Sequence, residues 1–194
     1  MQRGAVWICF VACVADKMKS KIITLSAVSA ALTALALTVG AYFEFLDLYC
    51  VVISSIFIIM PLYLNSYKGC FLCSLVGGII AFLFSGFNIL SLVFPAYFAF
   101  FGFYPIIKNL EVEKNFNKKL GFILGLIWFI AVAYGVYFYY TAIMNGIFDG
   151  LPEWIEEYIL YLIAPIALVF FVIYDKFVIV IRRFIDRYLG RFIR

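Results

Sequence analysis

Six long apolar runs leave this chain of 194 residues with few ways to fold. The runs cover residues 22–43, 49–64, 70–87, 89–107, 120–144 and 158 to about 174. A helix needs about 20 mostly apolar residues to cross the hydrocarbon core of a bilayer. The runs are continuous, unlike the alternating segments of about ten residues that build membrane β-barrels. We therefore expect an all-α integral membrane protein with six transmembrane helices.

The composition agrees with lipid as the solvent of this chain. Hydrophobic residues make up 67% of the sequence and charged residues 13%, whereas soluble domains carry roughly a quarter of charged residues. A chain of this size has too little interior to hide that much apolar surface from water. The composition thus excludes a soluble domain, a disordered chain and a nucleic-acid-binding module.

The charges between the runs alternate from one gap to the next. From residue 17 onward, Lys and Arg occur before the first run, between the second and third, between the fourth and fifth, and after the sixth. The gaps after the first and fifth runs carry Asp and Glu without any base. Because cytoplasmic loops carry the Lys/Arg excess, both termini are predicted to face the cytoplasm, across the cell (cytoplasmic) membrane.

The sequence divides into three parts. We expect an N-terminal extension over residues 1–21, a transmembrane domain over 22–180 and a cytoplasmic tail over 181–194. The apolar stretch 5–15 has 11 residues and is too short to span a membrane. It fits either a signal-peptide core or an over-extended start, with Met18 rather than Met1 as the true first residue.

The tail has apolar residues at helical spacing and basic residues between them. The basic positions expected at the membrane surface are Arg182, Arg183, Arg187 and Arg191. Such a basic amphipathic helix is suited to lie in the cytoplasmic interface, where anionic lipid attracts it. The alternative is a docking site for a cytoplasmic partner.

Several kinds of chemistry are excluded by the residues present. The chain has no histidine and no P-loop sequence, which removes histidine-based catalysis, histidine zinc sites and nucleotide binding by a P-loop. Cys70 and Cys73 have metal-ligand spacing but lie in an apolar run, and we interpret them as buried, inert thiols. We expect no enzymatic activity, no catalytic residues, no cofactor and no metal.

The acidic gaps and the aromatic end of the fifth run suggest a ligand-binding site on the non-cytoplasmic side of the membrane, called the outer ligand mouth below. The candidate residues are Glu44, Asp47, Asn88, Tyr137, Tyr140 and Trp154. Their aromatic rings could stack on a flat heterocycle while the polar groups fix its edge. The alternative is an aromatic belt with solvated acidic loops. No unpaired charge is expected inside a span, and Asp175 is expected to mark where the last span leaves the hydrocarbon.

The first run is rich in small residues. Ala27, Ala31 and Ala34 belong to a stripe at helical spacing, and small residues allow close helix packing in membranes. The run has more of them than one packing face needs, which suggests a second face for a partner protein. Ser74, Gly78 and Ala81 in the third run, and Gly121-x-x-x-Gly125 in the fifth, are interpreted as internal packing.

The order of these features resembles a known family. The stretch 22–34, a short second run and a Gly/Ala-rich third run are similar to the opening half of the substrate-binding (S) subunits of energy-coupling factor vitamin transporters. The resemblance implies capture of a small solute from outside, with ATP hydrolysis by separate ATPases. It also implies that Ala27, Ala31 and Ala34 contact a transmembrane coupling subunit.

A second resemblance points elsewhere. Phe100-Phe-Gly-Phe-Tyr104-Pro-Ile-Ile-Lys108, together with Tyr174-Asp175 and the basic residues that follow, is similar to uncharacterised membrane proteins of Gram-positive bacteria. That group implies no activity. The alternative function is therefore a non-transporting membrane scaffold, for example in envelope assembly.

Overall fold

The computed structural model describes the backbone of residues 3–87, 91–114, 117–143 and 153–192. Within these ranges every regular element is a helix or a helical turn. In chain order they are α1 (Arg3–Tyr42), the 3₁₀ turn η1 (Glu44–Leu46), α2 (Asp47–Ile59), the 3₁₀ turn η2 (Met60–Leu64), α3 (Tyr67–Phe84), α4 (Val93–Ala96), the π-helical turn η3 (Tyr97–Phe101), α5 (Tyr104–Glu113), α6 (Lys118–Ile143) and α7 (Glu153–Phe192). The expected all-α architecture is confirmed.

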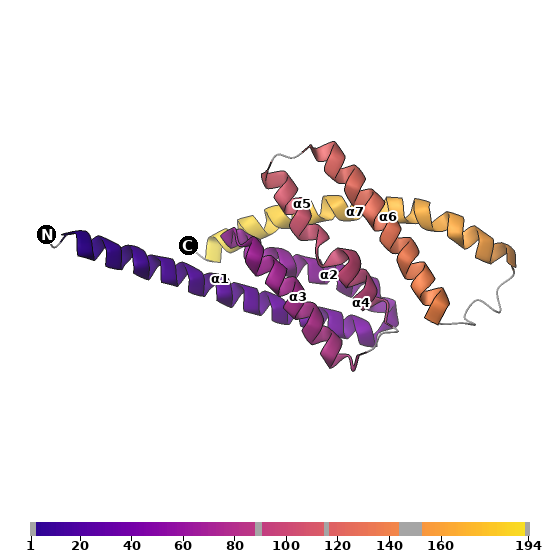
Figure 1. Ribbon diagram of the computed structural model, residues 1–194, viewed down its shortest axis with the longest axis horizontal. Helices are drawn as coiled ribbons and strands as arrows, with labels where there is room; N and C mark the ends of the chain where they lie inside the picture. The colour runs from indigo at the N-terminus through magenta and orange to yellow at the C-terminus, as the bar shows by residue number, and fades with distance from the viewer. Residues whose placement is uncertain (1–2, 88–90, 115–116, 144–152, 193–194) are drawn as a thin grey trace.

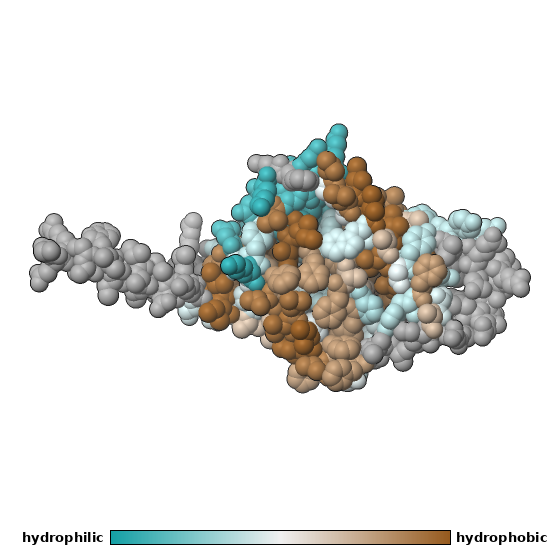
Figure 2. All heavy atoms as spheres, viewed as in Figure 1, coloured by the Kyte–Doolittle hydropathy of each residue, from teal (hydrophilic) through white to brown (hydrophobic). Residues whose placement is uncertain are grey.

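Five helical segments in the described part of the chain are long and apolar enough to cross a membrane. They are Ser20–Tyr42, Asp47–Leu64, Tyr67–Phe84, Lys118–Tyr139 and Tyr161–Tyr188. Large apolar side chains on these segments face outward, among them Ile23, Phe84 and Ile127 at 69%, 71% and 60% exposure. Figure 2 shows this apolar surface in brown over α3 and α6. A surface of this kind is stable against lipid rather than water, so the chain is a multi-pass membrane protein.

The helices form two groups joined by a broken segment. α1 packs on α2 and α3, and α6 packs on α7. The short elements α4, η3 and α5 lie between the two groups and contact both (Figure 1). The beginning of α1 and the end of α7 lie on the same side of the molecule.

The fourth expected span is not a continuous helix. Residues 88–90 lie outside the described residues, and the rest of the run is divided into α4, η3 and α5. Gly102 and Phe103 separate η3 from α5, and Pro105 follows at the start of α5. Proline suits the first turn of a helix but cannot donate to the backbone of the preceding turn. The described residues thus contain five continuous candidate spans, where the sequence predicted six.

Side chains from neighbouring helices satisfy the backbone at this break. The Ser74 hydroxyl on α3 donates to the Gly102 carbonyl at 2.8 Å, and the Ser55 hydroxyl on α2 lies 3.4 Å from the Phe101 carbonyl. The Tyr97 hydroxyl donates to the Ser74 carbonyl at 2.9 Å. Lipid offers no water to replace lost backbone bonds, so a broken membrane helix needs such donors.

An aromatic cluster holds α5, α6 and α7 together. Phe100 is fully buried; its ring stacks on Tyr104 at 4.6 Å and lies edge-on to Phe129 at 4.8 Å. Gly125 leaves room for this cluster, because a Cβ atom there would lie 2.9 Å from the Tyr104 ring and 3.0 Å from Phe171. Gly121 and Gly125 of α6, like the buried Ser74, Gly78 and Ala81 of α3, pack inside the bundle.

The two terminal helices are longer than the expected spans. α1 begins at Arg3, although the side chains of residues 3–19 lie outside the description. α7 continues without interruption through Pro165 to Phe192, so residues 181–192 extend the last helix and do not form a separate one. The division of the chain at residues 21 and 180 stays a prediction.

Candidate functional site

The outer ligand mouth stays a prediction. Outside the described residues lie Asn88 and the side chains of Glu44, Tyr140 and Trp154. Asp47 is the first residue of α2 and is half-buried. Tyr137 on α6 is also half-buried, with its ring edge-on to Phe138 at 5.7 Å. These two side chains alone do not define a binding site.

The three alanines expected to contact a partner protein do not all lie on the exposed face of α1. Ala27 and Ala31 are exposed, whereas Ala34 is 6% exposed and belongs to the buried core. The buried face of α1 lies against α3, where Thr33 meets Gly77 closely. The exposed small side chains therefore lie beside, and not within, the internal packing face.

The basic residues at the end of α7 have different surroundings. Arg182 is half-buried; it donates to the Asn109 side chain on α5 at 3.0 Å and lies 3.8 Å from Asp186. Arg183 and Arg187 are exposed, and the side chain of Arg191 lies outside the described residues. Arg182 thus fastens α7 to α5, and Arg183 and Arg187 remain open to the surroundings.

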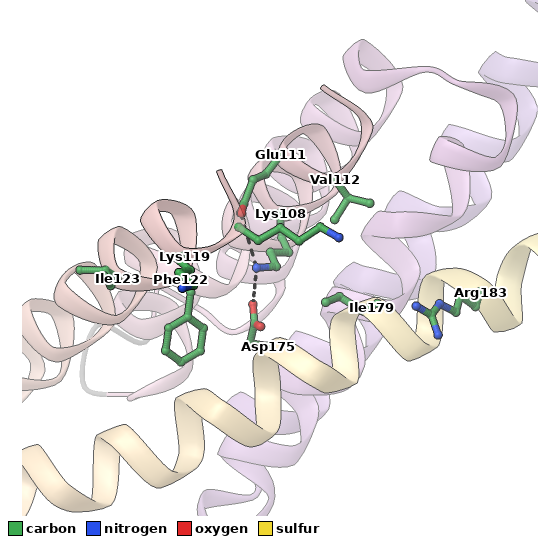
Figure 3. Close-up of a pocket in the computed structure, with 10 residues that line it drawn as sticks. Lys108, Glu111, Val112, Lys119, Phe122, Ile123, Asp175, Ile179 and Arg183 are labelled. Carbon is green, nitrogen blue, oxygen red and sulfur yellow. Dashed lines mark ion pairs between the residues drawn. The ribbon is translucent and has the colours of Figure 1, made fainter. Parts of the chain in front are cut away.

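A buried ion pair lies between α5 and α7. Asp175 is 7% exposed and lies inside the candidate span Tyr161–Tyr188. Its Oδ1 accepts a hydrogen bond from the Tyr104 hydroxyl at 2.5 Å and lies 2.9 Å from Lys108 Nζ. Lys108 is 6% exposed and also lies 3.5 Å from Glu111 (Figure 3). Asp175 is therefore buried between helices, and its expected place at the end of the last span stays a prediction.

The helical register of α5 brings these side chains together. Tyr104, Lys108 and Glu111 follow one another at spacings of four and three residues, which places them on one face of the helix. That face meets α7 at Asp175. A buried charge is stable only with a charged partner and further hydrogen bonds, and here Lys108 and the Tyr104 hydroxyl supply both.

No known protein family, curated protein or solved structure matches this chain.

The polar centre formed by Tyr104, Lys108 and Asp175 must therefore be interpreted from its own chemistry. Ionisable residues inside membrane segments are rare and commonly belong to functional sites. The charges of Lys108 and Asp175 are paired with each other. Their contact therefore holds α5 and α7 together. Among the described residues no three Cys, Asp or Glu side chains group as a metal ion would require. Cys70 and Cys73 are buried, free thiols.

The sequence contained the signal for this centre, in two separate places. Tyr104 and Lys108 end the Phe100–Lys108 motif, and Asp175 belongs to the Tyr174-Asp175 motif. Each motif resembled the same group of membrane proteins, but the residues alone gave no reason to pair them. The structure brings them together as the ion pair and hydrogen bond of one site.

Proposed function

We propose that this chain is the solute-binding membrane subunit of a multi-subunit importer, which takes up a small solute of the vitamin class. The observation that supports this most is the second, exposed small-residue face of α1. Ala27 and Ala31 are exposed although α1 already packs on α3 through its other face. Small residues let another membrane helix approach closely, as a coupling subunit would. ATP hydrolysis would take place in separate subunits.

The proposal includes a topology. Six passes through the cytoplasmic membrane, with both termini in the cytoplasm, agree with the distribution of Lys and Arg. The broken segment from α4 to α5 would form the fourth pass. The common side of the α1 start and the α7 end (Figure 1) supports an even number of passes.

Labelling of single cysteines in intact cells tests this topology. In a chain whose native cysteines are replaced by alanine, Lys114→Cys and Arg187→Cys should react with an impermeant maleimide only after the membrane is permeabilised. Phe45→Cys, between α1 and α2, should react in intact cells, because Phe45 is 78% exposed. Labelling of position 114 or 187 in intact cells would contradict the topology.

Co-purification from the native host tests the function. The wild-type chain, extracted in mild detergent, should retain a membrane coupling subunit, its ATPases and a small solute, all identified by mass spectrometry. Ala27→Leu/Ala31→Leu should lower the retained coupling subunit about tenfold, because each leucine prevents close helix approach. Val39→Phe is the matched control, since Val39 is 44% exposed and lies two turns beyond Ala31 on α1. Absence of the ATPases and the solute from the wild type would refute the proposal.

A scaffold without transport activity is the second candidate. Its support is the exposed end of α7, where the rings of Phe184 and Tyr188 lie 4.1 Å apart beside Arg183 and Arg187. A mixed apolar and basic surface suits a partner or the membrane interface. Deleting residues from 187 onward keeps the Arg182–Asn109 contact. That deletion should abolish a scaffold function and leave solute binding unchanged.

A further inference from the structure

An open cavity of about 550 Å³ lies between α5, α6 and α7, beside the Lys108–Asp175 ion pair (Figure 3). Ligand pockets commonly enclose about 300–1,000 Å³. The lining contains four cationic side chains and two carboxylates. The cavity thus has an excess of two positive charges and room for a small anionic group.

Three of its cations are available to a ligand. Lys108 is held by Asp175 and Glu111. Lys118 and Lys119 on α6, and Arg183 on α7, have no carboxylate of the described residues within ion-pair distance. α6 begins at Lys118, so the positive end of its dipole lies at the same place. The Lys119 and Gly121 N–H groups already donate to Asn117, so the side-chain cations supply the attraction for an anion.

The remaining lining is apolar and leads into the membrane-spanning part of α6. Phe122, Ile123 and Ile179 line the cavity together with the cations. Ile123 and Ile127, at 52% and 60% exposure, continue the apolar surface along α6. In Figure 2 hydrophilic residues gather where α5 ends and α6 begins, next to the apolar surface. The cavity therefore lies at a boundary between a polar and an apolar environment.

We propose that this cavity binds the phosphate group of an anionic phospholipid. Lys118, Lys119 and Arg183 would surround the phosphate, and an acyl chain would follow Ile123 and Ile127. Basic pockets between membrane helices are known to bind phosphate-containing lipid headgroups. Free phosphate would meet the same cations but gain nothing from the apolar surface, so the lipid is the better ligand. This site does not depend on whether the chain binds a solute.

Lipid binding to the purified full-length chain tests the assignment. Native mass spectrometry in non-ionic detergent would compare phosphatidylglycerol with phosphatidylcholine of the same acyl chains. The wild type should bind phosphatidylglycerol about a hundredfold more tightly, because three basic residues near an anionic headgroup contribute about 1 kcal/mol each. Inorganic phosphate at the same concentration should not displace the lipid. Equal affinity for the two lipids would overturn the proposal, and displacement by inorganic phosphate would assign the site to the free anion.

Two pairs of substitutions locate the site. Lys118→Gln/Lys119→Gln should lower the affinity for phosphatidylglycerol about thirtyfold and leave that for phosphatidylcholine unchanged. Both lysines are exposed, so the fold should be retained, and the elution volume in gel filtration checks this. Lys68→Gln/Lys176→Gln is the matched control, because both residues are exposed lysines outside the cavity. An equal loss in the two double variants would overturn the proposal in favour of unspecific surface charge.

Discussion

Replacing Lys108 by methionine should lower the free energy of unfolding by about 3–5 kcal/mol, as expected when one partner of a buried ion pair is removed. Methionine has a similar length but no charge, so Asp175 would lose its 2.9 Å contact with Nζ and keep only the hydrogen bond from Tyr104. Thermal unfolding in one detergent, monitored by circular dichroism, would measure the loss as a lower midpoint temperature.

A second substitution should recover most of that stability. In Lys108→Met/Asp175→Asn the buried negative charge is removed as well, and the amide oxygen of asparagine can still accept from Tyr104. Replacing both members of a buried pair costs far less than replacing one. Lys176→Met, at the exposed neighbouring position, should change the stability by less than about 0.5 kcal/mol. Equal unfolding temperatures of the single and double variants would contradict this prediction, because they would show that an Asp175 carboxylate without Lys108 costs no stability.

Gly77→Leu should separate α1 from α3 and lower the free energy of unfolding by about 3 kcal/mol, at the upper end of overpacking effects. A Cβ atom at this position would lie 2.9 Å from the Thr33 side chain and 3.1 Å from the Ala30 carbonyl oxygen. The Ala30 carbonyl oxygen belongs to the backbone of α1 and cannot move away by a change of side-chain rotamer. The yield of monodisperse protein in detergent and its unfolding temperature would both be expected to fall.

Gly135→Leu is the matched control for this prediction. A Cβ atom at Gly135 would meet no atom within 4 Å, so leucine should be tolerated there. It should even raise the stability slightly, since glycine inside a helix is unfavourable by about 1 kcal/mol. Equal instability of the two variants would show that the α1–α3 contact is not close at Gly77.

Apolar length was sufficient to predict where the continuous spans lie, because each needs only local sequence. The break near Gly102 was not predicted, since it depends on hydroxyl groups that Ser55 and Ser74 bring from other helices. Hydropathy counts the apolar residues of a run and carries no information about which backbone carbonyls receive a donor from elsewhere.

The ion pair escaped prediction for a similar reason. Lys108 and Asp175 are 67 positions apart in the chain, and each lies close to the polar end of its apolar run. Taken alone, each position is compatible with the membrane boundary. Only the tertiary contact between α5 and α7 shows that both side chains are buried. The small residues that pack inside the bundle, such as Gly78 and Gly125, were easier to interpret, because their size permits close helix contact.

The unbroken course of α7 has a geometric consequence. Its 40 residues correspond to a rod of about 60 Å at the usual rise of an α-helix, about twice the thickness of the hydrocarbon layer. Part of this rod must stand clear of the lipid tails or lie obliquely among the headgroups. Because the Asp175 and Arg182 contacts fasten α7 to α5, packing on the bundle sets the angle at which this helix leaves the lipid tails.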